Sequence, residues 1–129
     1  MKYKTIFTLI GTIHILIGLC VIGMMLNFDS VIGSLLSHDV SEEVNSLLLK
    51  QLRVITFHAL GIGLILFFCR NIKSEEDIKR ILTGYIAFAC LILSNAFYAE
   101  FFGQGGPPLP IFILLISGAL LGGVGILKK

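Results

Sequence analysis

Four long apolar segments divide the chain, and polar residues collect between them. They cover residues 5–26, 52–69, 81–102 and 109–127. Each has roughly the 17–25 residues that an α-helix needs to cross the hydrocarbon core of a bilayer. Lipid offers no hydrogen-bond partner to backbone groups, and no alternation of polar and apolar residues indicates a transmembrane barrel. We therefore predict four transmembrane helices.

The composition agrees with lipid as the solvent of this chain. Hydrophobic residues make up 56% and charged residues 14% of 129 residues, whereas an ordinary globular domain has roughly 25% charged residues. A soluble domain this small could not bury so much apolar surface, because its surface-to-volume ratio is high. Residues 1–129 are predicted to form one all-α transmembrane domain. A net charge of only +2, without a basic stripe, excludes a nucleic-acid partner.

The basic residues predict how the helices are oriented. Eight of the ten lie before the first segment, between the second and third, or after the fourth, and the other two are Lys50 and Arg53. The positive-inside rule assigns the richer face to the cytoplasm. Since short connections favour antiparallel neighbours, we predict a four-helix up-and-down bundle with both termini cytoplasmic.

Two polar clusters predict helix starts. Asp39 followed by Glu42 is typical of a capping box, which predicts a helix that starts near Val40 and continues through the second segment. Ser74 precedes three carboxylates, as expected for an N-cap followed by acidic residues in the first turn.

Two histidines lie inside apolar segments, where ionisable residues are costly and are candidates for function. At the helical rise, His14 lies roughly 13 Å and His58 roughly 18 Å from the cytoplasmic ends of their segments. Three interpretations remain open at this point. Each ring could hydrogen-bond a neighbouring helix, both could line a polar pocket for a lipid-like or quinone-like molecule, or both could be axial ligands of a haem.

The third segment carries a polar stripe. Ser94 and Tyr98 share a helical face, and Asn95 lies beside them. With His58 they predict a ligand pocket that opens toward the outer leaflet. The alternative interpretation is that these side chains make interhelical hydrogen bonds.

Charged and aromatic residues also mark the outer ends of the second and third segments. Arg53 and Glu100 could form an interhelical ion pair, or each could extend to water. An interfacial aromatic belt is predicted from Phe97, Tyr98, Phe101 and Phe102.

Small residues predict where helices touch. Gly118 and Gly122 form a GxxxG pattern on the fourth segment, and Gly11 and Gly18 flank His14 on the first. Glycine lets helix backbones approach closely in lipid, either within one chain or between chains.

The chain has no HExxH, CxxC, Walker or GxSxG motif, and no cluster with metal-ligand spacing. We predict no catalytic residues and no metal site, apart from the haem alternative. The protein is therefore not expected to be an enzyme.

The arrangement resembles the DoxX-like group of small four-helix bacterial membrane proteins. The resemblance is carried by the stretch GTIHILIGLCVIG of the first segment, the acidic outer loop and the short basic cytoplasmic loop. It covers the whole chain, is architectural, and transfers no site residue. It implies an accessory or quinone-proximal role in the bacterial cytoplasmic (inner) membrane, among subunits or partners of membrane redox complexes.

Taken together, these patterns predict a small integral-membrane binding or accessory protein. Its pocket, formed by His58, Ser94, Asn95 and Tyr98 with His14 nearby, would hold a lipid-like or quinone-like molecule. One alternative is a membrane redox protein with bis-histidine haem. The other is a purely structural subunit, in a homo-oligomer or a membrane complex, that packs through its GxxxG pattern.

Overall fold

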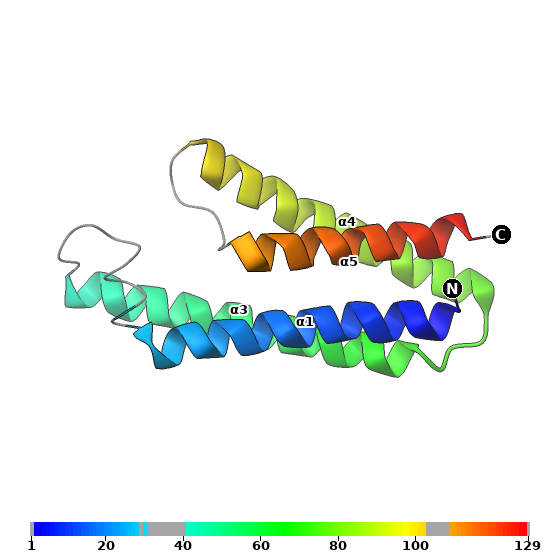
Figure 1. Ribbon diagram of the computed structural model, residues 1–129, viewed down its shortest axis with the longest axis horizontal. Coiled ribbons are helices and arrows are strands. Elements are labelled where there is room, and N and C mark those ends of the chain that lie inside the picture. The colour runs from blue at the N-terminus through cyan, green and yellow to red at the C-terminus, as the bar shows by residue number, and fades with distance from the viewer. Residues whose placement is uncertain (1, 29, 31–40, 103–108, 129) are drawn as a thin grey trace.

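The computed structural model describes residues 2–28, 30, 41–102 and 109–128. Four α-helices make up this part of the chain: α1 (Tyr3–Leu26), α3 (Glu42–Cys69), α4 (Glu75–Phe101) and α5 (Leu109–Leu127) (Figure 1). Each helix covers one of the four predicted apolar segments to within one residue, and all four are long and apolar enough to cross a membrane. The all-α prediction is confirmed for the described residues, and the helices indicate an integral membrane protein.

The start of α3 differs from the prediction. The helix begins at Glu42, and its N-cap is Ser41, whose side chain accepts a hydrogen bond from the Val44 N–H at 3.4 Å. The predicted start near Val40 was therefore two residues too early, and Asp39 lies outside the described residues. A serine hydroxyl caps a helix as well as a carboxylate does, so Ser41 can take this position directly before two glutamates.

The start of α4 follows the prediction. The Ser74 hydroxyl accepts a hydrogen bond from the Asp77 N–H at 3.3 Å, and three acidic residues fill the first turn. Glu75 and Glu76 also pair with Lys79 and Arg80 one turn later. Carboxylates in this position are stabilised by the positive end of the helix dipole.

Replacement of Ser74 by alanine is expected to lower the free energy of unfolding by about 1 kcal/mol, because the first turn of α4 loses its cap. Denaturation in mixed detergent micelles, followed by circular dichroism, measures this change. Ser94→Ala is the control, because Ser94 is exposed in the middle of the same helix. An equal loss in both variants would contradict the capping role.

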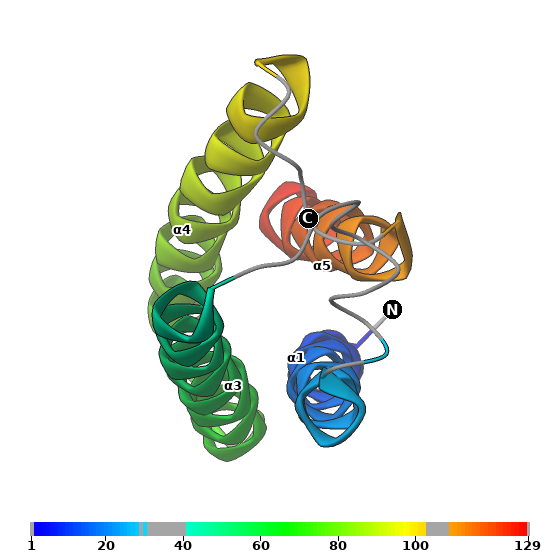
Figure 2. The same ribbon diagram turned by 90° about the vertical axis from the view of Figure 1, so that its left-hand side faces the viewer.

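The helices pack in a definite order. The close pairs are α1 with α3, α4 with α5, and α1 with α5. Both termini and the connection from α3 to α4 lie at one end of the molecule, which we call the terminal end (Figure 1). The opposite end, where α3 begins and α4 ends, we call the distal end. Figures 1 and 2 show that α4 leans away from α1 toward the distal end.

Two apolar clusters hold the helices together. The larger one combines residues from α1, α3 and α4, among them Phe7, Leu66 and Leu82. The second lies further toward the distal end and joins α1, α3 and α5 through Ile17, Ala59 and other residues. Many other large apolar side chains are exposed, as expected for helices whose outer faces contact lipid.

Glycines allow the closest helix contacts. A Cβ atom at Gly11 would lie 3.0 Å from the carbonyl oxygen of Gly63, and one at Gly18 would lie 2.7 Å from a methyl group of Leu60. On α5, a Cβ atom at Gly118 would meet the Tyr85 hydroxyl, and one at Gly122 would lie 3.0 Å from Ile86. All four glycines singled out in the sequence thus lie at contacts within one chain.

Candidate functional site

A buried polar contact lies at the centre of the bundle. His14 is only 3% exposed, and its Nε2 atom lies 3.1 Å from the hydroxyl oxygen of Tyr85. The two rings meet edge to face, with centroids 5.5 Å apart. The Tyr85 hydroxyl also lies against Gly118. The hydrogen bond between His14 and Tyr85 therefore joins α1 to α4. The glycine at position 118 of α5 leaves room for the tyrosine hydroxyl.

His58 has a different environment. It lies on α3, is exposed, and its Nδ1 atom is 2.8 Å from the carbonyl oxygen of Val54 in the same helix. Within the described residues, no hydrogen bond or ring contact joins it to His14.

A haem held by these two histidines does not fit this arrangement. His14 Nε2 already takes part in a buried hydrogen bond, and the His58 ring is on the exposed surface of α3. Bis-histidine ligation requires two imidazoles that face one another across the iron. Among the described residues, no group of three or more His, Cys, Asp or Glu side chains could hold another metal ion.

The other predicted pocket residues lie on α4. Ser94, Asn95 and Tyr98 are all exposed, and α4 is not a close neighbour of α3. The structure therefore does not bring His58 together with them, and His14 is turned toward Tyr85 instead.

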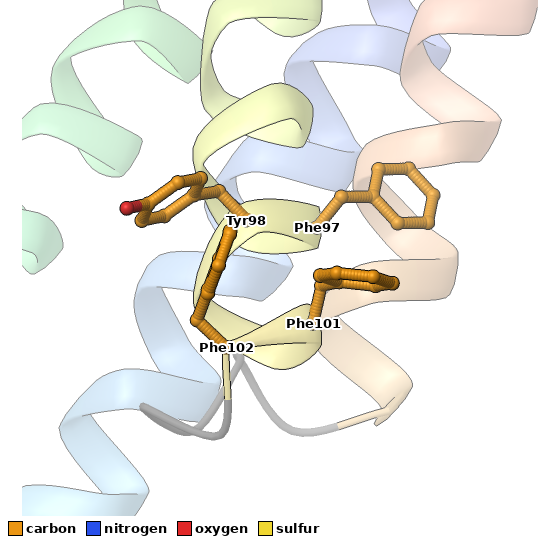
Figure 3. Close-up of a pocket in the computed structure, with 4 residues that line it drawn as sticks. All are labelled: Phe97, Tyr98, Phe101 and Phe102. Atoms are coloured by element: carbon orange, nitrogen blue, oxygen red, sulfur yellow. The ribbon is translucent and has the colours of Figure 1, made fainter.

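An aromatic pocket occupies the distal end of α4. Four side chains line it: Phe97, Tyr98, Phe101 and Phe102 (Figure 3). Its volume is about 440 Å³, and it is open to the surroundings. The rings of Tyr98 and Phe102 lie 4.4 Å apart, and Phe97 packs edge-on against Phe112 of α5 at 4.8 Å. The residues of the predicted aromatic belt thus form a concave surface, which their i, i+1, i+4, i+5 spacing could have indicated.

A second open groove lies on the first turns of α3, and sequence reasoning missed it. Its volume is about 310 Å³. It is lined by Glu42, Asn45, Ser46, Leu49, Lys50 and Arg53. The predicted partner of Arg53, the Glu100 side chain, lies outside the described residues, so the ion pair stays a prediction.

At the terminal end, polar contacts tie three helices together. The Tyr3 hydroxyl donates to Glu75 Oε1 at 3.1 Å, and the same carboxylate oxygen pairs with Lys79 at 2.8 Å. The ammonium group of Lys128 lies 4.3 Å above the Tyr3 ring. This geometry is that of a cation–π contact, and it joins the start of α1 to the end of α5.

The function has to be inferred from this geometry. No protein-family model, curated protein or solved structure matches the chain.

Proposed function

We propose that this chain is a small integral-membrane protein that binds a lipid-like or quinone-like molecule in the aromatic pocket of α4. The observation that carries the proposal is the open cavity of about 440 Å³ formed by four aromatic side chains at the distal end. Such a molecule combines a long apolar chain with a polar head. No reaction is included in the proposal.

The proposed topology is an up-and-down bundle in the bacterial cytoplasmic membrane, with both termini in the cytoplasm. Its support is the distribution of charge, because eight of the ten basic residues belong to the terminal end. By the positive-inside rule this end faces the cytoplasm. The aromatic pocket would then lie in the outer leaflet.

Aromatic side chains suit this role for a physical reason. Inside a membrane the hydrophobic effect does not favour the pocket over lipid, so binding depends on close packing and on hydrogen bonds. Rigid rings lose little conformational entropy when a ligand packs against them, and they stack well on planar headgroups. The pocket itself is lined almost entirely by carbon atoms, and the Tyr98 hydroxyl points away from the other three rings (Figure 3). Polar groups for the head of the ligand are therefore found beside the pocket, on Tyr98 and, one turn away on the same helix, on Ser94 and Asn95. These three residues of the predicted pocket are retained in the proposal, without His58.

A second candidate function is a structural or accessory subunit of a membrane complex. It is favoured by the exposed distal half of α4, whose close neighbour within the bundle is α5 alone. This role agrees with the DoxX-like resemblance, which remains part of the proposal.

Phe101→Ala tests the pocket directly. We expect native mass spectrometry of the protein in mild detergent to show a retained lipid-like molecule. The variant should retain about fivefold less of it, because one of the packing rings is lost. The accurate mass of the retained molecule distinguishes a quinone from an acylated lipid.

Phe68→Ala is the matched control. Phe68 lies on α3, and its side chain is 79% exposed, compared with 85% for Phe101. Equal retention in the two variants would contradict the aromatic pocket. Recovery of the protein only with a fixed polypeptide partner, and without a small molecule, would favour the structural subunit.

A further inference from the structure

Two basic residues break the charge pattern of the chain, and they lie in one place. Lys50 and Arg53 are the only lysine and arginine outside the terminal end, and both line the groove on the first turns of α3. Their i, i+3 spacing puts them on one helical face. A pair of cations on one face is suited to an anionic group, and a phosphate in particular.

The same groove contains an unsatisfied acceptor. The side-chain oxygen of Asn45 is buried and has no hydrogen-bond partner within the described part of the chain. Buried polar atoms are nearly always paired, so the Asn45 amide beside the groove is suited to a hydrogen-bond donor brought by a ligand. Ser46 and Glu42 line the groove beside it and add two further acceptors. The groove therefore offers cations at one end and acceptors at the other.

Helix geometry brings these two sets of groups together. Long side chains on a helix lean toward its N-terminus, which directs Lys50 and Arg53 toward the turn that holds Asn45 and Ser46. These residues directly precede the apolar segment 52–69, so the groove lies at the level where a bilayer has its headgroups. Leu49 adds an apolar contact between the polar groups.

We infer that this groove binds the headgroup of a phospholipid that carries both a phosphate diester and a primary ammonium group. Lys50 and Arg53 bind the phosphate, while Asn45 and Ser46 accept hydrogen bonds from the ammonium group. Glu42 adds electrostatic attraction for the same cation. The site lies on α3 and is separate from the aromatic pocket of α4, so either proposal can fail without the other.

The test uses the full chain in mild detergent, titrated with lipids of matched acyl chains and observed by native mass spectrometry. Phosphatidylethanolamine has both headgroup charges, phosphatidylglycerol has the phosphate alone, and a diglucosyl diacylglycerol has neither. We expect affinity to fall in that order. Lys50→Gln with Arg53→Gln should weaken binding of phosphatidylethanolamine about tenfold, because two charge-assisted contacts are lost.

Asn45→Ala separates the two halves of the site. It should weaken binding of phosphatidylethanolamine and leave binding of phosphatidylglycerol unchanged. The control is Arg70→Gln with Lys73→Gln, which removes the same two residue types at the same spacing from the terminal end. Equal weakening by the two double variants would overturn the proposal. So would equal affinity for all three lipids, or an Asn45→Ala variant that keeps the wild-type preference.

Discussion

Replacement of Gly63 by valine is expected to lower the free energy of unfolding by about 2 kcal/mol, which is typical of overpacking in a well-packed core. A Cβ atom at this position would lie 2.8 Å from a side-chain carbon of Ile15 and 3.0 Å from the carbonyl oxygen of Gly11. The second contact is with backbone, which cannot rotate away. The two closest helices, α1 and α3, would have to separate. Unfolding in mixed detergent micelles, followed by circular dichroism, measures the change.

Gly61→Val provides the matched control. It is two residues away on the same helix, and a Cβ atom there would have nothing within 4 Å. We expect the free energy of unfolding of this variant to fall by less than about 0.5 kcal/mol, because valine is a better helix former than glycine. Similar losses in the two variants would show that α1 and α3 do not pack as the structure has them.

Replacement of Tyr85 by phenylalanine is expected to cost about 1.5 kcal/mol of unfolding free energy. Interhelical hydrogen bonds in membranes contribute only about 0.6 kcal/mol on average, because the separated groups find other partners. His14 is 3% exposed, so its Nε2 atom cannot reach another partner without repacking of the bundle. The cost therefore approaches that of an unsatisfied buried polar group, which is about 1–3 kcal/mol.

A double-mutant cycle distinguishes this hydrogen bond from simple loss of packing. His14→Leu and Tyr85→Phe together should cost less than the sum of the two single variants. Each single variant leaves one buried polar group without its partner, whereas the double variant leaves none. Tyr98→Phe is the control, because it removes a hydroxyl from an exposed ring on the same helix. Additive effects in the cycle would mean that the two side chains do not interact.

The helices themselves could be predicted from the sequence because each depends on a local property. An uninterrupted apolar run of the right length can satisfy its backbone only as a helix in lipid. The caps are local as well, although two competent cap residues stood close together before α3. Ser41 is the N-cap of α3. The capping-box pattern favoured Asp39, because the sequence alone does not show which of the two residues caps the helix.

The candidate site was less predictable because it depends on which faces meet. His14 and His58 lie at similar depth on adjacent helices, and depth alone favours a site that contains both. Their directions are set by packing, and the close contact of Gly11 with Gly63 turns other faces of α1 and α3 toward each other. His14 is then free to face Tyr85, a residue that no sequence pattern had connected to it. The groove around Lys50 and Arg53 is different, because all of its lining residues lie on α3. Their i, i+3, i+4, i+7, i+8, i+11 spacing is a local signal that the sequence contains.

The partnership of His14 with Tyr85 also sets an order of events during biosynthesis. The two residues are 71 positions apart in the chain, and at a typical translation rate the second follows the first by roughly 4–14 s. Throughout that interval the His14 imidazole of the newly synthesised α1 cannot hydrogen-bond Tyr85, which has not yet been added to the chain. An incomplete polypeptide that ends before α4 has no Tyr85 hydroxyl for the His14 ring, and this distinguishes it chemically from the finished protein.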